Sequence, residues 1–238
     1  MGKPSYCDHQ KTWATNGGGH ADLMIAEATG CVRLPDSLPF DHAAPMMCAG
    51  FTAMSAYRRA APASSDRIAV LGLGGLGHLA VQIAKAHGHE VVVVTGTKGK
   101  IEDARRLGAD HVVEVQAHAG RELAVIGGAN VVLATSNHMG QTSQILQGLR
   151  PEGRLVTVAA VGQPIAADPI LLLEKELRLI GAHTSHREDL VEVLNLAASG
   201  KVKPWLVPVP ATAQCLTEAL KNLDAGRVRY RQVASWLP

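Results

Sequence analysis

Short apolar runs of strand length alternate with helical stretches from Arg67 onward. In the first helical stretch, Leu79 and Ile83 recur at helical spacing and Gly88 ends the helix. Another helix is expected between Met139 and Leu149. An alternation of this kind predicts a parallel sheet wrapped by helices. The six predicted strands are Ile68–Leu71, Val91–Val94, Val112–Val115, Val131–Ala134, Leu155–Val161 and Leu177–Ile180.

The regions on either side of this alternation have other patterns. Before it, a helix is expected from about His42 to Ala60, with Pro45 in its first turn. After Gly181 the pattern predicts two helices and two extended segments. The helices are Asp189–Ala198 and Ala213–Leu223, and the extended segments are Val207–Pro210 and Val228–Trp236.

Composition narrows the class of protein. The 238 residues are 47% hydrophobic but only 3% aromatic, so the core must be aliphatic, as in an α/β protein with buried parallel strands. The net charge of +2 gives no electrostatic argument for binding nucleic acid or a membrane surface. The sequence shows neither an apolar run of membrane-spanning length nor a secretory signal, and its four cysteines form no CxxC pair. We therefore expect a cytoplasmic protein without a disulfide framework.

A glycine-rich turn follows the first predicted strand and opens the first helix of the alternation. Gly72 permits a tight turn, Gly74 lets the backbone approach a pyrophosphate, and Gly77 allows close packing of helix on strand. The amides and dipole of the helix N-terminus attract phosphate. The sequence therefore predicts a dinucleotide site, and the alternative is a glycine-rich turn without a ligand. The expected contacts are Gly72, Gly74, Gly75, Leu76 and Gly77.

The end of the second strand selects between the two nicotinamide cofactors. NAD-binding sites place a carboxylate there, whereas the nearest acids weighed here, Glu90 and Glu102, lie before the strand and in the following helix. Hydroxyls and lysines suit the dianionic 2′-phosphate of NADP(H), so NAD is the weaker expectation. The alternative is that the lysines only solvate a surface turn. The expected 2′-phosphate contacts are Thr95, Thr97, Lys98 and Lys100.

One segment before the glycine turn resembles a known family. Residues 41–52, DHAAPMMCAGFT, are similar to the AAPxxCAGxT segment of zinc-dependent alcohol dehydrogenases. The resemblance covers essentially the whole chain, and the 95–100 turn is closest to the cinnamyl-alcohol-dehydrogenase-like, NADP-preferring branch. It continues through Gly72–Gly77, Leu107–Asp110, Leu179–Ala182, Gly200–Pro204 and Ala225–Arg231.

The resemblance implies a fold and a division of the chain. The fold would be a Rossmann doubly wound parallel six-stranded sheet of order 3-2-1-4-5-6, with a partial GroES-like, β-rich catalytic domain. Residues 1–47 would be a remnant of the catalytic domain, 48–182 the dinucleotide-binding domain, and 183–238 a return to the catalytic domain. The family pairs subunits through the sixth strand, so a homodimer is expected near Glu176–Ile180.

The resemblance also implies cofactor contacts outside the glycine turn. Thr135 and Ser136, with Asn137, match residues that contact the nicotinamide ribose. Val161 lies near the nicotinamide carboxamide in the family, and Arg231 matches an arginine that pairs with the pyrophosphate.

The zinc ligands that the resemblance implies are incomplete. Cys48 matches the third ligand of the catalytic zinc, Thr52 a residue that touches the nicotinamide, and Cys7 the last of four structural-zinc cysteines. The other ligand motifs of the family are missing, and a catalytic zinc needs three protein ligands. We therefore expect a truncated chain that keeps the cofactor domain and does not retain zinc.

Three functions stay open at this point. The first is an NADP-dependent oxidoreductase acting on a small alcohol or aldehyde, with zinc as Lewis acid in the full family. The second is a non-catalytic dinucleotide-binding module, indicated by the incomplete zinc ligands. The third is a zinc-free relative such as a quinone or enoyl reductase, against which Cys48 and Cys7 argue.

Overall fold

The protein is described by a computed structural model that covers most of the chain. Cys7 and the other residues of the amino-terminal 22 lie outside the described part. The described residues are 23, 25–26, 28–158, 161–184 and 186–235.

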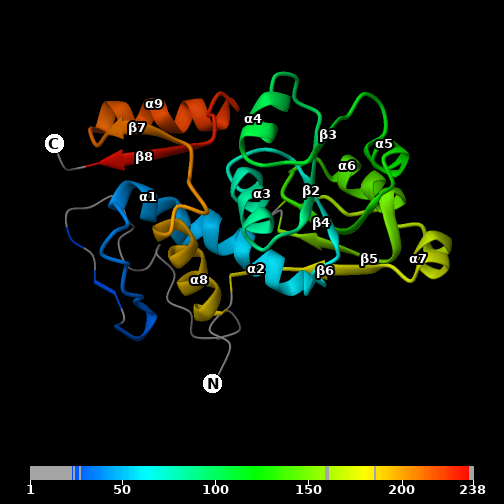
Figure 1. Ribbon diagram of the computed structural model, residues 1–238. Coiled ribbons are helices and arrows are strands. Elements are labelled where there is room, and N and C mark those ends of the chain that lie inside the picture. Colours follow the sequence, from blue (N-terminus) through cyan, green and yellow to red (C-terminus); the bar gives the residue numbers. More distant parts are fainter. Residues whose placement is uncertain (1–22, 24, 27, 159–160, 185, 236–238) are drawn as a thin grey trace.

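A six-stranded parallel sheet forms the centre of the molecule (Figure 1). Its order, β3-β2-β1-β4-β5-β6, confirms the expected doubly wound Rossmann topology. All five neighbouring pairs run parallel, as crossover helices require. The strands are β1 Arg67–Leu71, β2 Glu90–Thr95, β3 His111–Glu114, β4 Ala129–Ala134, β5 Leu149–Thr157 and β6 Arg178–Gly181.

The fifth strand differs most from its prediction. It starts at Leu149 and ends at Thr157, whereas the apolar pattern placed it at 155–161. Ala129 pairs with Leu149 but Val131 pairs with Arg154, so the register shifts across residues 150–153, which are Arg-Pro-Glu-Gly. That irregular part carries no period-two apolar signal, and for this reason the pattern missed it. Val161 lies outside the strand.

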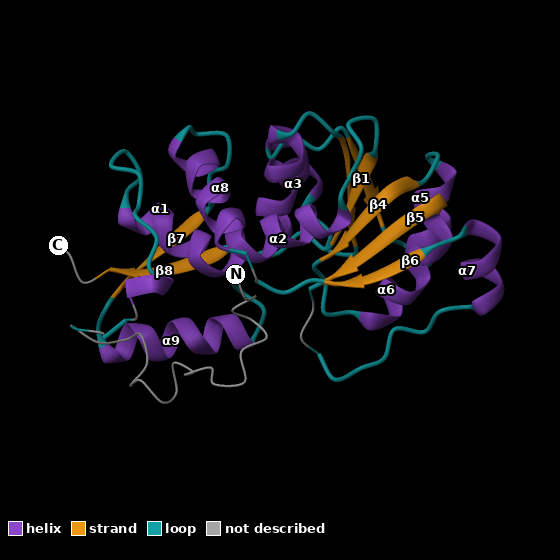
Figure 2. Ribbon diagram, turned by 90° about the horizontal axis from the view of Figure 1, so that it is seen from below, coloured by secondary structure: helices purple, strands orange, loops and turns teal. Residues whose placement is uncertain are grey.

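Helices cover both faces of the sheet (Figure 2). Ile68 and Val70 of β1 face one apolar core, and Ala69 and Leu71 face the other, as alternation along a strand requires. Burial of a branched side chain contributes about 1.5–3 kcal/mol, so this two-sided burial is a main source of stability. The first core is covered by α2 Phe51–Ala60, α3 Gly77–Ala86 and α4 Ile101–Arg106, and the second by α5 Ala119–Val125, α6 Met139–Gln144, η4 Ile145–Gly148 and α7 Pro169–Lys175.

The helix expected at 42–60 is continuous but not uniform. It comprises α1 Phe40–Pro45, the π-helical turn η3 Met46–Gly50, and α2. The helix begins two residues before its predicted start, so Pro45 lies in the second turn and not the first. Pro45 has no N–H to donate within the helix, which explains why the regular hydrogen bonding ends there and a wider turn follows.

A short η2 turn, Ala28–Gly30, lies near the amino-terminal end of the described chain.

The carboxy-terminal part adds a second, smaller layer. Strands β7 Leu206–Pro210 and β8 Arg231–Ser235 pair parallel in a separate two-stranded sheet beside α1 and α9 (Figure 1). The helices are α8 Arg187–Ala198 and α9 Ala213–Asp224, close to their predicted bounds.

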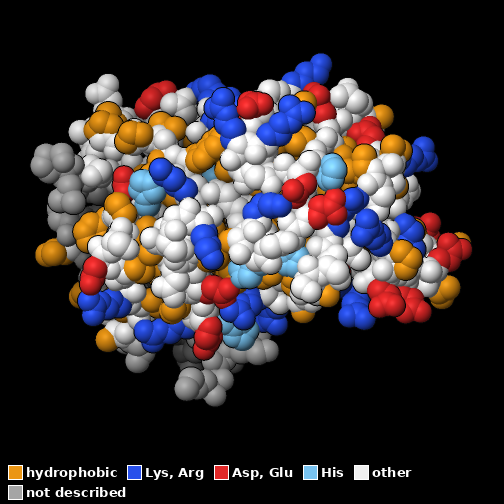
Figure 3. All heavy atoms as spheres, viewed as in Figure 1, with side chains coloured by type: hydrophobic (Ala, Val, Ile, Leu, Met, Phe, Trp, Pro, Cys, Tyr) orange, Lys and Arg blue, Asp and Glu red, His pale blue; other side chains and the backbone are white. Residues whose placement is uncertain are grey.

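The surface of this second layer is partly apolar. Hydrophobic side chains lie over α9 in Figure 3, where Leu220 and Leu223 are exposed. Charged side chains of both signs are spread over the remainder of that face, in keeping with the small net charge. Within the described residues, no helix has the length and apolar character that crossing a membrane requires. The three-part division of the chain stays a prediction.

Candidate dinucleotide-binding site

The turn between β1 and α3 begins with a residue that must be glycine. Gly72 has a φ of +92°, which side-chain-bearing residues rarely adopt, and its N–H donates to the Val94 carbonyl at 2.8 Å. A Cβ on Gly72 would lie 3.0 Å from the Cβ of Ser136. Ser136, predicted as a ribose contact, therefore lies directly beside the turn.

The end of the turn is packed too closely for any side chain. A Cβ on Gly77 would lie 2.0 Å from the Gly72 carbonyl oxygen and 3.0 Å from the Thr135 hydroxyl oxygen. That hydroxyl donates to the Gly72 carbonyl at 2.9 Å and lies 3.1 Å from the Leu71 carbonyl. Gly77 thus seats the start of α3 against the strand, and Thr135 braces the turn from the end of β4.

The middle of the turn is open on one side and occupied on the other. A Cβ on Gly74 would meet nothing within 4 Å, whereas a Cβ on Gly75 would lie 2.8 Å from Nη1 of Arg231. The Leu76 side chain makes no capping hydrogen bond at the start of α3. An open backbone surface, a helix N-terminus and a guanidinium therefore meet at one place, which is the arrangement that binds phosphate.

His78 hydrogen-bonds to the glycine turn, a role that no local pattern predicted. Its Nδ1 lies 3.1 Å from the Gly74 carbonyl oxygen, and its Nε2 accepts a hydrogen bond from the backbone N–H of Trp205 at 3.3 Å. Because Nε2 accepts, Nδ1 carries the proton and donates to Gly74. The imidazole is buried and stacked on Tyr230 at 5.0 Å, and this burial lowers the pKa of His78 to about 4.

The turn after β2 carries the predicted 2′-phosphate contacts in different environments. Thr95 is buried, and its hydroxyl accepts the Thr97 N–H at 3.3 Å. Thr97 and Lys98 are exposed. Lys100 is half-buried, and its ammonium donates to the Leu73 carbonyl at 2.6 Å, which ties this turn to the glycine turn. Burial, with the nearby Arg229 charge, lowers the pKa of Lys100.

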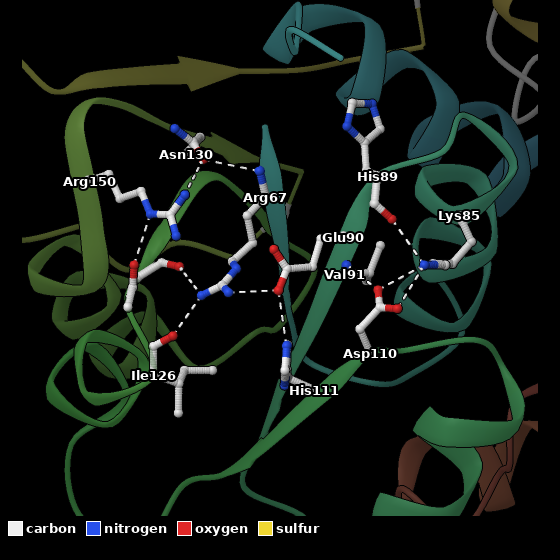
Figure 4. Close-up of polar contacts among 12 residues, drawn as sticks. Arg67, Lys85, His89, Glu90, Val91, Asp110, His111, Ile126, Asn130 and Arg150 are labelled. Carbon is white, nitrogen blue, oxygen red and sulfur yellow. Dashed lines mark hydrogen bonds and ion pairs between the residues drawn. The ribbon is translucent and has the colours of Figure 1, made fainter. Parts of the chain in front are cut away.

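The two acids weighed from the sequence are engaged elsewhere. Glu90 lies at the amino end of β2, where it pairs with Arg67 at 2.6 Å and His111 at 3.0 Å (Figure 4). Glu102 pairs with Arg106 one helical turn further along α4. Both observations agree with the prediction that neither acid serves the carboxyl end of β2.

Two other acidic residues lie near the carboxyl end of β2, and the sequence pattern did not indicate either of them. Glu114, the last residue of β3, is in register with Thr95 and is partly buried. Asp103 of α4 is nearly buried and accepts hydrogen bonds from Arg229 and Tyr230. Burial alone would raise the pKa of Asp103, but those hydrogen bonds outweigh it and hold the pKa below its usual value. The local pattern gave no signal for Asp103 because its partners lie 126 and 127 positions away in the sequence.

The residues predicted for the metal and the nicotinamide lie apart from the turn in sequence. Cys48 is exposed on η3, Thr52 is partly buried on α2, and Val161 is partly buried between β5 and α7. Within the described residues, no three histidine, cysteine, aspartate or glutamate side chains converge to hold a metal ion. The described donor set at Cys48 therefore does not make a zinc site.

The sheet order and the glycine turn together define a Rossmann-type protein. Residues 75–199 match the family model described as "Zinc-binding dehydrogenase". The chain is 35% identical to an alcohol dehydrogenase of Geobacillus stearothermophilus, covering 95% of this chain and 69% of that protein. The chain therefore belongs to the zinc-binding dehydrogenase family, which confirms the resemblance to zinc-dependent alcohol dehydrogenases.

Other relatives agree with this assignment. The chain is 33% identical to the NADP-dependent alcohol dehydrogenase C 1 of Mycolicibacterium smegmatis over 91% of this chain and 61% of that protein. A cinnamyl alcohol dehydrogenase structure from Sorghum bicolor superposes with a TM-score of 0.76 at 32% identity, covering 85% of this chain and 57% of that one. The chain thus spans about three-fifths of the length of several relatives that it matches.

Proposed function

We propose that this chain binds NADP(H) and serves as the cofactor-binding part of an oxidoreductase that acts on a small alcohol or aldehyde. The observation that carries the proposal is the glycine turn. Its open Gly74 surface, the uncapped start of α3 and the Arg231 guanidinium beside Gly75 converge on one place. The NADP-dependent relative of 33% identity supports the same cofactor.

Each part of the cofactor has residues suited to hold it. The turn Gly72–Gly77 and Arg231 would bind the pyrophosphate, because backbone amides and a guanidinium both favour anionic oxygens. Thr135 and Ser136, beside Gly72, would contact the nicotinamide ribose. Thr52 and Val161 would line the nicotinamide. When bound, the nicotinamide would donate a hydride to the substrate carbon or accept one from it.

The preference for NADP(H) follows from charge near the end of β2. Lys98 and Lys100 lie on the turn that follows this strand, and Glu90 is paired at its opposite end. A 2′-phosphate gains from these cations, whereas the 2′-hydroxyl of NAD(H) needs an acceptor carboxylate.

A titration with NADPH and NADH tests both parts of the proposal. We expect NADPH to raise the melting temperature and to bind more tightly than NADH. In the Lys98→Gln variant, which keeps the Lys100 bond to the Leu73 carbonyl, we expect the NADPH affinity to fall while the NADH affinity stays the same. Absence of binding by either cofactor would refute the dinucleotide site, and tighter NADH binding would refute the NADP preference.

A second candidate is a non-catalytic dinucleotide-binding module. The exposure of Cys48, without three converging metal ligands among the described residues, favours this reading. Zinc content and aldehyde reduction with NADPH distinguish the two. Bound zinc with turnover contradicts the module, and NADPH binding without metal or turnover contradicts catalysis by this chain alone. Reduction of a quinone or enone that a chelator does not inhibit would instead indicate a zinc-free reductase.

The edge of the sheet supports a homodimer. Strand β6 is the terminal strand, and Leu179 on it is 41% exposed. An exposed edge strand pairs readily with a second copy. We expect a dimer mass by light scattering, and we expect Leu179→Arg to produce a monomer of unchanged helix content. A monomeric mass for the unaltered protein would refute the dimer.

A further inference from the structure

The segment that precedes β8 lies beside the turn that follows β2, although the two are far apart in the sequence. In Figure 1 the loop after α9 comes close to α4 and α3. Arg229 and Tyr230 of this segment both donate hydrogen bonds to Asp103 of α4. The proposed 2′-phosphate site therefore has a neighbour that no local pattern reveals.

Asp103 holds Arg229 in one orientation. One carboxylate oxygen, Oδ2, accepts from Arg229 Nε at 2.8 Å, from Arg229 Nη2 at 2.5 Å and from the Tyr230 hydroxyl at 2.5 Å. The Asp103 side chain is only 12% exposed, whereas that of Arg229 is 54% exposed. The buried acid thus fixes one edge of the guanidinium, and much of the side chain remains accessible to a ligand.

The fixed guanidinium lies against the turn that is expected to bind the 2′-phosphate. Arg229 Nη2 also donates to the Gly99 carbonyl at 2.9 Å, one residue before Lys100. The Lys100 ammonium lies 5.7 Å from the centre of the Tyr230 ring. Two cations from distant segments therefore flank the same stretch of backbone.

We propose that Arg229 is a further specificity-determining residue, which binds the 2′-phosphate of NADP(H), and that Asp103 is its positioning residue. This inference rests on the NADP(H) site proposed above. A planar guanidinium suits phosphate oxygens, and preorganisation by Asp103 removes much of the entropy cost of holding a long side chain. The Arg229 charge offsets that of Asp103, so this pair does not repel the incoming phosphate, and the exposed part of the guanidinium can donate hydrogen bonds to it.

The competing explanation is that Arg229 only fastens the carboxy-terminal segment to α4. That role would change stability, or the affinity for both cofactors, but it would not distinguish NADPH from NADH. The ratio of the two affinities therefore separates the explanations.

The test compares Arg229→Gln with a matched control on the same segment. Arg227 bonds to the Asn222 side chain at 2.9 Å, so Arg227→Gln removes a nearby charge that is not held by Asp103. Loss of a hydrogen bond to a charged group costs about 1.5–3 kcal/mol. A tenfold change in the dissociation constant corresponds to about 1.4 kcal/mol. We therefore expect Arg229→Gln to weaken NADPH binding at least about 10-fold and to leave NADH binding unchanged. Arg227→Gln should change neither affinity by more than about twofold, since an exposed surface charge contributes little.

Two further variants complete the test. We expect Arg229→Lys to restore part of the NADPH preference, because it keeps the charge without the planar fork. Asp103→Asn should lower the NADPH affinity, and its NADH affinity and melting temperature report whether the fold persists.

The outcomes distinguish this inference from the proposed function. If the unaltered protein binds neither cofactor, the proposed function fails. If it prefers NADPH but Arg229→Gln changes both affinities equally, or changes neither, the NADP(H) site stands and the role of Arg229 is refuted.

Discussion

Two glycines of the same turn should respond to alanine in opposite ways. A methyl group on Gly77 would overlap the Gly72 carbonyl oxygen at 2.0 Å, so the start of α3 or the end of β1 must move. A methyl group on Gly74 would meet nothing within 4 Å of the protein, so the fold should tolerate it. The open side of Gly74 is where the pyrophosphate is proposed to approach.

The magnitudes follow from these distances. Overpacking in a well-packed region costs about 1–3 kcal/mol, and a 2.0 Å contact with backbone falls at the upper end of that range. A loss of 1 kcal/mol lowers the melting temperature by about 2–4 °C in a protein of this size. We therefore expect Gly77→Ala to melt roughly 6–12 °C lower, from a cost of about 3 kcal/mol. Gly74→Ala should melt within about 2 °C of the unaltered protein.

The assay is thermal melting with and without cofactor. Saturation at 100 times the dissociation constant stabilises the folded state by about 2.7 kcal/mol, which corresponds to a rise of roughly 5–11 °C. The unaltered protein should show this rise with NADPH, and Gly74→Ala should lose most of it. Gly30→Ala is a matched control, because a Cβ there also meets nothing within 4 Å and the residue lies in η2, which contains none of the proposed cofactor contacts.

Two results would refute this reasoning. A melting temperature of Gly77→Ala equal to that of the unaltered protein would mean that the packing at the start of α3 is not as described. Full stabilisation of Gly74→Ala by NADPH would mean that the cofactor does not approach the open side of the turn.

Three further predictions follow from other side chains. The folded-state pKa of His78, about 4, lies below the ordinary 6.5, so its neutral form contributes stability above pH 6.5 that is lost as the pH falls towards 4. This loss amounts to at most about 3 kcal/mol. Urea titrations between pH 4 and 7 should show that the free energy of unfolding of His78→Gln depends less on pH than that of the unaltered protein. Asp66 pairs with the largely buried Arg154 at 2.5 Å, so Asp66→Ala should lower the free energy of unfolding by about 3–5 kcal/mol, measured by denaturant titration. Glu90→Gln should leave the NADPH-to-NADH affinity ratio unchanged and cost less than about 1 kcal/mol, because the Glu90 side chain is 43% exposed and lies at the other end of β2.

The central fold could be predicted because its signal is local. Helices cover both faces of the sheet, so the central strands are buried on both sides. For this reason β1, β2 and β4 are nearly continuous apolar runs that differ clearly from the helices between them. The glycine turn was recognisable for the same reason, since the spacing of its glycines between a strand and a helix is itself a local signal. Where the ladder is irregular, as in 150–153 of β5, the pattern fails because polar residues interrupt the apolar run.

Features that depend on tertiary contacts could not be read from local patterns. The π turn at Met46–Gly50 packs against α8, and a Cβ on Gly50 would lie 3.3 Å from Val193, a contact that no sequence period shows. The role of His78 has no local signal because its partner Trp205 comes from the segment before β7. Its role under the turn becomes visible only when the chain returns to the sheet.

The cofactor preference illustrates how a local argument can omit residues and keep its conclusion. In the sequence, Lys98 and Lys100 follow the second strand, whereas Glu90 and Glu102 lie before that strand and in the next helix. The structure adds Asp103 and Glu114 near the end of β2, which would favour NAD(H) by charge if they stood alone. It also brings Arg229 to Asp103, and the guanidinium charge offsets that of the nearer acid. The balance at this edge of the sheet is therefore still positive, because the fold supplies a cation from the distant segment before β8.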